Sequence, residues 1–268
     1  MALNKNPQVS VLISVYRADL DVLRESLDSI FSQSFTDFEV IIVDDGNEPL
    51  VSQYISDLGV SDARVTVIKN PVNIGLTASL VIAGKLARGV YLARQDADDV
   101  SLPGRLERQV SFMRAHPDLA LLGGSYLIRF GLGGRVKEYF RSETDEADIQ
   151  EFFFRNPICH SSAMFRRDIY DLCGGYDPAF YTTQDLDLWF RLARHGRVGF
   201  LSDRLVERRI LRNSISVSRL AILQVLNSLK VRLRERSRLG RRFSALLIFY
   251  IGVKHVLSIF LVRALRSY

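Results

Sequence analysis

The chain has 268 residues, of which 47% are hydrophobic, and its 36 basic and 30 acidic side chains give a formal net charge of +6. A chain of this length and composition can bury a full-sized core, which excludes an intrinsically disordered protein. Its two cysteines, Cys159 and Cys173, are too few for a disulfide framework. Because no signal peptide opens the sequence, we expect a protein of the reducing cytoplasm.

The basic charge is concentrated at the carboxyl end of the chain. From Arg219 onward there are 11 Lys and Arg against one acid, Glu235, or +10, whereas the rest of the chain has 25 against 29, or −4. Such a basic tail is expected to contact an anionic surface, either lipid headgroups or nucleic acid.

Short runs rich in Val and Ile alternate with amphipathic segments through the first half of the chain. This alternation predicts βα units around a largely parallel sheet, and therefore an α/β fold. The expected strands are residues 9–15, 38–43, 64–68 and 90–93. The expected helices are residues 20–31, 76–88 and 105–116, the last of them ended by Pro117.

The second half is interpreted as strands and helices that complete the same sheet. A Gly-rich stretch at residues 131–134 and a polar run at 142–148 interrupt the alternation. After Ser218 the apolar pattern is helical to the end. We therefore predict a main domain of residues 1–217 and a basic amphipathic helical tail of residues 218–268.

Acidic residues follow two of the predicted strands at their carboxyl ends, where open α/β sheets bind ligands. The second strand ends in Asp44-Asp45-Gly46 and the fourth in Asp96-Ala97-Asp98-Asp99, while Ser14-Val15-Tyr16-Arg17 ends the first. In an extended turn, the two carboxylates of a D-x-D triplet can face one divalent cation, or one cation and a ribose. Oxygen ligands favour Mg²⁺ or Mn²⁺. The alternative is that these acids only cap or close turns.

Motifs of several other enzyme classes are absent from the sequence. No G-x-G-x-x-G follows the first strand, and neither the P-loop G-x-x-x-x-G-K-[ST] nor the nucleophile elbow G-x-S-x-G occurs. The histidines have no paired spacing for zinc, and we interpret each as structural. These histidines are His116, His160, His195 and His255.

The order of the segments resembles that of the inverting family 2 glycosyltransferases, which have the GT-A fold, over roughly residues 9–216. The matching segments are Val9 to Tyr16, Ser26 to Phe35, Ile42 to Gly46, Asn73-Ile74-Gly75, Asp96 to Asp99 with Leu102-Pro103 and Arg105-Leu106, Gly174 to Asp177, and Gln184 to Trp189. The resemblance implies a Rossmann-like mixed sheet flanked by helices. It also implies transfer of a sugar from a nucleotide-diphosphate donor to an acceptor hydroxyl.

The resemblance implies roles for particular residues on the donor side. Tyr16 and Asp45 would lie along the base and ribose, which favours uracil or thymine, and Asp44 would support the turn or share the contact. Asp96 would face the ribose, and Asp98 would bind the Mg²⁺ or Mn²⁺ that bridges the phosphates and stabilises the leaving nucleoside diphosphate. The implied nucleotide-sugar site is completed by Ser14, Asn73 and Arg105.

Asp185 is the implied catalytic base. It would take the proton of the acceptor hydroxyl that attacks the anomeric carbon, and this single displacement inverts that carbon. Asp185 can also be a simple N-cap, and in either role the helix dipole is expected to lower its pKa. Gln184 and Trp189 are expected on the acceptor side.

Two positions depart from the family pattern. Members usually have Glu-Asp where this chain has Gln184-Asp185, and many have a histidine, proposed as a further metal ligand, where this chain has Leu211. Metal binding would then rest on Asp98, the phosphates and water. Alternatively, Arg209 and Arg212 would neutralise the diphosphate themselves.

The apolar run Phe243 to Val262 is interrupted by Lys254 and His255, so its uninterrupted parts are too short to cross a bilayer of about 30 Å. Burying Lys254 at mid-bilayer would cost about 3 kcal/mol. We expect the tail to lie peripherally in the headgroup region of the inner membrane face. The alternatives are a helical pair packed on the body or on a second subunit, and membrane insertion. The arginines expected on lipid phosphates are Arg232, Arg234, Arg236, Arg238, Arg241 and Arg242.

The predicted function is sugar transfer from a UDP- or dTDP-linked donor to a lipid-linked or polysaccharide intermediate in cell-surface glycan synthesis. The alternative is a catalytically silent nucleotide-sugar-binding or scaffolding subunit, suggested by Gln184 and Leu211. Nucleic-acid binding by the tail is disfavoured because no aromatic platform interleaves with its arginines.

Overall fold

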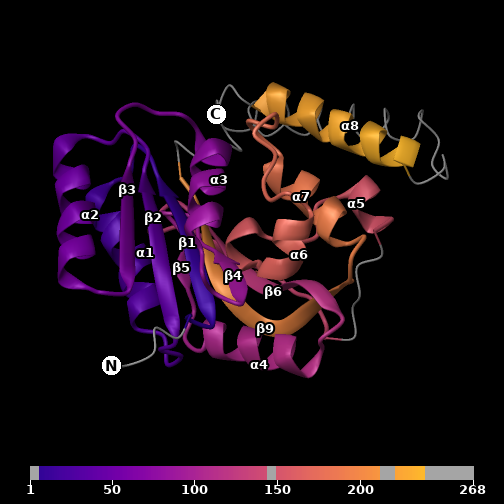
Figure 1. Ribbon diagram of the computed structural model, residues 1–268, viewed down its shortest axis with the longest axis horizontal. Helices are drawn as coiled ribbons and strands as arrows, with labels where there is room; N and C mark the ends of the chain where they lie inside the picture. The colour runs from indigo at the N-terminus through magenta and orange to yellow at the C-terminus, as the bar shows by residue number, and fades with distance from the viewer. Residues whose placement is uncertain (1–5, 144–148, 212–220, 239–268) are drawn as a thin grey trace.

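The computed structural model describes residues 6–143, 149–211 and 221–238, which form one mixed sheet with helices on both faces (Figure 1). The strand order is β3-β2-β1-β4-β8-β6-β9-β5, with β7 paired to β6 off this path. The strands are β1 Val9–Val15, β2 Phe38–Asp44, β3 Val65–Lys69, β4 Tyr91–Arg94, β5 Val100–Ser101, β6 Leu119–Phe130, β7 Val136–Tyr139, β8 Met164–Arg166 and β9 Arg197–Ile210. The predicted α/β class is confirmed.

Helices connect these strands and cover the sheet. They are α1 Leu20–Phe31, α2 Pro49–Ser61, α3 Leu76–Leu86, α4 Arg105–Ala115, α5 Glu151–Phe154, α6 Arg167–Leu172, α7 Gln184–Leu192 and α8 Ala221–Arg238, with a 3₁₀ turn at His160–Ser162. The helices α1, α3 and α4 confirm the three predicted from apolar periodicity. The sequence analysis did not predict α2, which has Pro in its first turn and buries only three side chains.

The first half of the sheet is parallel and the second half is not. β1 pairs in parallel with both β2 and β4, and β2 with β3. Beyond β4, the short strand β8 runs antiparallel to both β4 and β6, whereas the long strands β6 and β9 are parallel to each other. The parallel strands bring the carboxyl ends of β1, β2 and β4 to one edge, where ligands of open α/β sheets bind.

Two apolar clusters fill the space on either side of the sheet. One contains Leu23 and Leu27 of α1, Ile55 of α2 and Leu106 of α4. The other contains Leu80 of α3, Phe152 and Phe153 of α5, the aromatic residues of α7, and Val231 of α8. The molecule is therefore a three-layer arrangement in which α8 belongs to the core.

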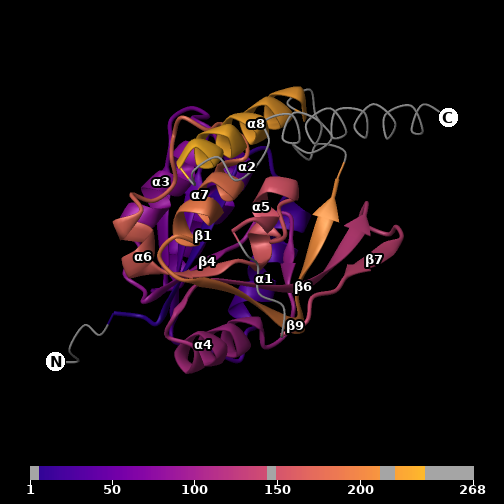
Figure 2. The ribbon, with the colours of Figure 1, turned by 90° about the vertical axis from the view of Figure 1, so that its right-hand side faces the viewer.

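Helix α8 packs along α7 and above α5 (Figures 1 and 2). Asn227 Nδ2 donates a hydrogen bond to Thr182 Oγ1 at 2.9 Å. Arg232 is only 6% exposed and donates from Nε to the carbonyl oxygen of Phe152 at 3.0 Å. Arg234 pairs with Asp187. For this helix the alternative of packing on the body is therefore right.

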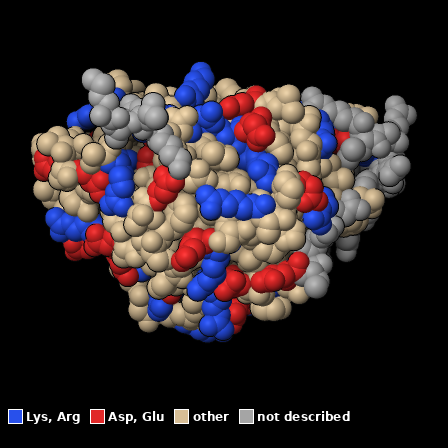
Figure 3. Space-filling view, turned by 60° about the horizontal axis from the view of Figure 1, so that its bottom comes forward, with Lys and Arg blue, Asp and Glu red and all other residues tan. Residues whose placement is uncertain are grey.

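Two of the arginines expected on lipid phosphates are thus turned into the protein. Arg232 and Arg234 use their guanidinium groups on the body, which corrects that part of the prediction. Arg241, Arg242, the apolar run after them and the boundary expected at residues 217–218 lie outside the described residues. In the described part of the chain, no helix has the length and apolar character needed to cross a membrane. On the face seen in Figure 3, described basic and acidic side chains are interspersed.

Candidate active site

Asp45 lies just beyond β2, and its buried carboxylate organises the loop that leads into α3. Oδ1 accepts hydrogen bonds from Asn70 Nδ2 at 2.8 Å and from the Ile74 amide at 2.9 Å. Oδ2 accepts from Asn73 Nδ2 at 2.6 Å and from the Gly75 amide at 2.9 Å. Both oxygens are therefore occupied by the protein, so the expected contacts of Asp45 and Asn73 with the base and ribose are replaced by a bond between them.

Asp44 supports the turn after β2, which was one of its two expected roles. Its Oδ1 accepts hydrogen bonds from the amide and the Nδ2 of Asn47 at 3.1 and 2.7 Å, and its Oδ2 accepts from the Ser52 hydroxyl. The side chain is buried. Asp44 therefore fixes the shape of the turn from inside and presents no oxygen to a ligand.

Tyr16 and Ser14 remain open at the end of β1. Tyr16 is 42% exposed, Ser14 is half-buried, and the Arg17 guanidinium lies 5.2 Å from the centre of the Tyr16 ring. Arg17 has a φ of 49°, which turns the chain sharply after the strand. An exposed ring at a strand end offers a flat surface for a nucleobase.

Three carboxylates of the D-x-D segment gather beyond β4, and they differ in their partners. Asp96 pairs with the fully buried Arg94 and accepts a hydrogen bond from Ser161 Oγ at 2.9 Å. Asp99 is buried; its Oδ2 contacts the Ser161 hydroxyl, and its Oδ1 accepts a hydrogen bond from the Arg209 amide at 2.8 Å. No other described residue donates a hydrogen bond to the Asp98 carboxylate. Asp98 is therefore the carboxylate of the three that is most open to a cation.

The three carboxyl groups also differ in pKa. Burial, with the charge of Asp96 second, raises the pKa of Asp98 to about 6. Burial, followed by the charges of Asp96 and Asp98, likewise raises the pKa of Asp99 well above its ordinary value. Burial opposes ionisation of Asp96 too, but the Arg94 charge, followed by smaller favourable contributions, lowers its pKa overall. The cluster is thus strained by its own negative charge, and a bound cation would relieve it.

The residues of the cluster suit a cation that arrives with phosphates. Within the described residues, no three His, Cys, Asp or Glu side chains are arranged to hold a metal ion by themselves. Mg²⁺ is commonly bound by one or two carboxylates together with substrate phosphates and water. The half-buried Asp98, with no competing donor, fits that kind of binding.

Arg105 supports the D-x-D segment through hydrogen bonds within the protein, in place of its expected role in sugar binding. It is fully buried, and burial lowers its pKa to about 10. Its guanidinium donates at 2.8 Å to Gln95 Oε1, to Ser101 Oγ and to the carbonyl oxygen of Arg94, and at 3.0 Å to Gln109 Oε1. Every nitrogen of the guanidinium donates to an acceptor within the protein, so Arg105 positions the segment that carries the acids.

Asp185 is the second residue of α7, rather than the N-cap of that helix. Its carboxylate is half-buried, and its Oδ2 accepts a hydrogen bond from Asn156 Nδ2 at 2.6 Å. Burial raises the pKa of Asp185, outweighing the backbone and Asn156 hydrogen bonds that lower it. The expectation of a pKa lowered by the helix dipole is therefore wrong, and the raised value makes this carboxylate a stronger base.

Trp189 lies in the core instead of lining the acceptor side. It is fully buried, and its ring makes edge contacts with those of His160 and Phe165. The apolar spacing that predicted a helix also turns this side chain into the core. Gln184, the first residue of α7, is 6% exposed, and its place on the acceptor side stays a prediction.

Several residues of the site were not found from the sequence. Ser161 bridges Asp96 and Asp99, Asn156 holds Asp185, and His160 Nε2 lies 2.8 Å from Tyr176 Oη. Burial lowers the pKa of His160 to about 3, so its ring is neutral. No strand or helix pattern marks these residues, because they lie in the irregular segment before β8.

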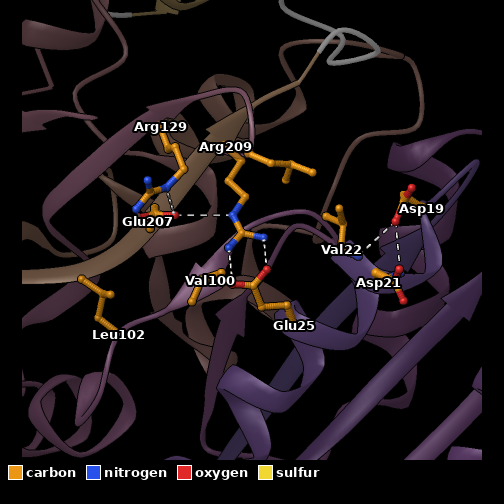
Figure 4. Close-up of a pocket in the computed structure, with 10 residues that line it drawn as sticks. Asp19, Asp21, Val22, Glu25, Val100, Leu102, Arg129, Glu207 and Arg209 are labelled. Atoms are coloured by element: carbon orange, nitrogen blue, oxygen red, sulfur yellow. Dashed lines mark hydrogen bonds and ion pairs between the residues drawn. The ribbon is translucent and has the colours of Figure 1, made fainter. Parts of the chain in front are cut away.

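A separate cavity of about 630 Å³ lies beside α1 and the end of β9 (Figure 4). Its charged groups are largely paired: Arg209 binds Glu25 at 2.6 and 2.8 Å, and Arg129 binds Glu207 at 2.6 Å. Because side chains alternate along a strand, Arg209 projects from the opposite face of β9 to its neighbour Arg208. The expectation that Arg209 neutralises a diphosphate is therefore wrong, and Arg212 lies outside the described residues.

Known proteins share this architecture. A model of the family "Glycosyl transferase family 2" matches residues 10–173. The putative glycosyltransferase EpsE of Bacillus subtilis (strain 168) is 34% identical over 204 residues, which cover 74% of this chain and 71% of that protein. The O-antigen biosynthesis glycosyltransferase WbnJ of Escherichia coli is 30% identical over 250 residues, or 88% of this chain and 93% of that one.

Solved structures agree with the sheet topology. The structure of S. aureus TarS 1-349 in complex with UDP-GlcNAc superposes with a TM-score of 0.71 at 16% identity, covering 93% of this chain and 71% of that one. The mannosyltransferase PcManGT of Pyrobaculum calidifontis, in complex with GDP-Man and Mn²⁺, gives a TM-score of 0.66 at 14% identity, covering 95% and 75%. The chain belongs to glycosyl transferase family 2 and is a glycosyltransferase with the GT-A fold.

Proposed function

We propose that this protein transfers a sugar, with inversion, from a UDP- or dTDP-linked donor to a hydroxyl of a lipid-linked or polysaccharide intermediate in cell-surface glycan synthesis. The observation that carries the proposal is the joint placement of Asp185 and the D-x-D acids. One short segment of the chain contacts both groups, because Asn156 Nδ2 donates to Asp185 at 2.6 Å and Ser161 Oγ donates to Asp96 at 2.9 Å. The site therefore has both a base and a place for a charged leaving group.

The donor half of the site comprises Tyr16, Ser14 and the acid cluster. The exposed Tyr16 ring would stack on the base, and Asp96, which is one-third exposed, would accept hydrogen bonds from the ribose. Asp98 would bind Mg²⁺ or Mn²⁺ together with the diphosphate. The metal, when bound, stabilises the negative charge of the leaving nucleoside diphosphate. The GDP-Man and Mn²⁺ complex of PcManGT supports this class of donor binding.

The acceptor half is centred on Asp185. As the acceptor oxygen bonds to the anomeric carbon, the bond from that carbon to the phosphate oxygen breaks and the electron pair leaves with the nucleoside diphosphate. Asp185 takes the proton of the attacking hydroxyl, and Asn156 keeps the carboxylate oriented by its 2.6 Å hydrogen bond. Attack opposite to the leaving group inverts the carbon.

The acceptor class and the cellular place rest on relatives and on charge. WbnJ is named for O-antigen biosynthesis, and AmsE of Erwinia amylovora, 30% identical over 203 residues, for amylovoran biosynthesis. Such acceptors suit an enzyme held peripherally at the cytoplasmic membrane face. The basic residues beyond α8 would supply that attachment.

The first test is hydrolysis of a panel of UDP-, dTDP- and GDP-sugars with Mn²⁺, with Mg²⁺ or with chelator, followed by release of the nucleoside diphosphate. We expect slow metal-stimulated release from one donor, and its loss in Asp98→Ala. Asp185→Asn should lower sugar transfer to membrane-extract acceptor by about 10²–10⁴-fold without weakening nucleotide binding. Asp177→Asn, which removes a peripheral carboxylate at the α8 contact, is the matched control.

A different outcome would favour the silent subunit suggested by Gln184 and Leu211. Nucleotides would then bind, but no donor would turn over even with membrane extract as acceptor. Asp185→Asn would change nothing measurable. That result would remove the roles proposed for Asp98 and Asp185.

A further inference from the structure

Arg208, close to the end of β9, is a half-buried cation beside the acid cluster that has no direct partner. Its guanidinium makes no hydrogen bond or ion pair with any residue that the structure describes. Its charge nevertheless acts on Asp96, Asp98 and Asp99, and of the neighbouring arginines it lowers the pKa of Asp98 more than Arg94 does. The guanidinium is therefore near the acids without being bound to them.

The strand pairing fixes this position. Arg208 lies opposite Ile128 in the β6–β9 ladder, and the amide of the next residue, Arg209, donates to Asp99 Oδ1 at 2.8 Å. β9 is thus tied to the D-x-D segment through its backbone. Alternation then sends Arg208 to the face of the acids and Arg209 to the cavity on the other face.

The other guanidinium groups around the cluster have their partners. Arg94 pairs with Asp96 and donates to the Leu12 carbonyl. Arg105 is surrounded by four neutral acceptors. Arg209 is held by Glu25 and Glu207. Among these four arginines of the described chain, Arg208 is the one whose five N–H donors remain available for a ligand.

Keeping such a group in a partly dry site is costly unless an anion completes it. The acids do not do so: Asp96 is already paired with Arg94, and the two oxygens of Asp99 contact the Ser161 hydroxyl and the Arg209 amide. A guanidinium fork matches phosphate oxygens in two parallel hydrogen bonds. The ligand that would satisfy both Arg208 and a cation on Asp98 is a diphosphate.

We propose that Arg208 binds the diphosphate of the donor directly, so that the protein retains affinity for a nucleoside diphosphate when no divalent cation is present. This inference rests on the proposed function, since the diphosphate belongs to the donor. Arg208 would take the place in charge neutralisation that was expected of Arg209, which is bound to Glu25. It would also stabilise the charge that develops on the leaving diphosphate.

The test is calorimetric titration of metal-free protein, in chelator, with UDP, dTDP or GDP, whichever the wild type binds, and with the matching nucleoside. In Arg208→Gln we expect the Kd of the nucleoside diphosphate to rise about 10- to 100-fold, as for loss of a charge-assisted phosphate contact. The Kd of the nucleoside should not change. Arg208→Lys should lie between the two, because it keeps the charge and loses the fork.

Arg204→Gln is the matched control. Arg204 is on the same strand and carries the same charge, but it is exposed and pairs with Glu138 of β7 at 2.7 Å. Its substitution should leave both dissociation constants unchanged. Thermal melts of all three variants show whether each is folded, and Arg208→Lys carries the test if Arg208→Gln is not.

Each other outcome has a distinct meaning. If Arg208→Gln binds the diphosphate as the wild type does, or weakens the nucleoside equally, the inference is overturned and the proposed function stands. If the wild type binds no diphosphate until Mn²⁺ is added, the inference is also overturned. If the wild type binds none of the three nucleotides with or without Mn²⁺, the proposed function itself fails.

Discussion

Two buried clusters of charge lie in this molecule, and they are completed in different ways. Under α7 and α8, Asp187 is fully buried and receives Arg191 Nη2 at 2.6 Å on one oxygen and the Arg234 guanidinium on the other. Glu235, also fully buried, pairs with Arg194 and Arg234. Every acid of this cluster has a cation from a neighbouring turn or helix.

The cluster beyond β4 is left incomplete. The Asp98 carboxylate receives no hydrogen bond from another described residue, burial raises the pKa of Asp99, and the Arg208 guanidinium has no direct partner among the described residues. Buried charges that are all paired hold α7 and α8 together, whereas buried charges without partners are unfavourable until a ligand binds them. The charges between α7 and α8 thus stabilise the fold, and those beyond β4 are left to bind the substrate.

The largest expected effect comes from breaking the cluster under α7 and α8. Asp187→Asn leaves the Arg191 guanidinium without its carboxylate and removes one of the carboxylates that pair with Arg234, and we expect a loss of about 3–5 kcal/mol in the free energy of unfolding. Urea unfolding at neutral pH measures it. Asp177→Asn is the control, because Asp177 is one-third exposed and 3.5 Å from Arg234, and should cost less than about 1 kcal/mol. Equal losses of unfolding free energy in the two variants would show that the buried ion pairs of Asp187 stabilise the fold no more than the partly exposed pair of Asp177.

Removing a carboxylate from the cluster beyond β4 should raise the free energy of unfolding instead of lowering it. Asp98→Asn removes a charge that its neighbours disfavour, so we expect a gain of about 1–2 kcal/mol in unfolding free energy at pH 7.5 in chelator. The pKa of Asp98 is about 6 in the folded protein, above that of an unfolded aspartate. The penalty therefore grows as the pH rises through 6 and disappears below about 4, where Asp98 is protonated in both states.

Urea unfolding of wild type and Asp98→Asn at pH 4 and pH 7.5 checks this sign. The gain should be present at the higher pH and absent at the lower one. A destabilised variant at pH 7.5 would mean that the Asp98 carboxylate contributes to the fold, as Asp187 does. The contrast between the two clusters would then be lost.

The sequence predicted the backbone of the first half more accurately than the side-chain partners. Strands β1 to β4 and helices α1, α3 and α4 follow from periodicities that depend only on which residues are apolar. Whether Asp45 or Arg105 faces a ligand depends on the loops and helices that meet it, and these come from elsewhere in the chain. Both proved to be bound by the protein itself.

The tail shows the same limit. A basic, apolar helix on a membrane surface and one on a protein surface have similar sequences, because both need an apolar stripe and long cationic side chains. The two kinds of helix differ in whether the protein offers acidic residues that bind the basic side chains, as α7 does here. The sequence does not reveal this, because Asp187 lies 47 residues from its partner Arg234. Likewise, deciding whether Arg208 or Arg209 faces the acids required knowing which side chains of β9 point to each face of the sheet, and this was not predicted from the sequence.

The smallest expected effect concerns the orientation of the proposed base. Asn156 is exposed, so Asn156→Ala should leave the fold intact, but it removes a hydrogen bond that favours the ionised form of Asp185. The pKa of Asp185, already raised by burial, should rise further, by up to about one unit. Because the base acts only when ionised, the acidic limb of the kcat/KM profile should move to higher pH.

The pH profile of donor turnover with membrane-extract acceptor measures this shift. We expect the plateau at high pH to fall by less than about 10-fold, since Asp185 still accepts the proton there. Asn156→Asp should move the limb further, because a second negative charge would oppose ionisation of Asp185. An unmoved limb in both variants would show that the group titrating in the reaction is not Asp185, and the base would have to be sought elsewhere in the site.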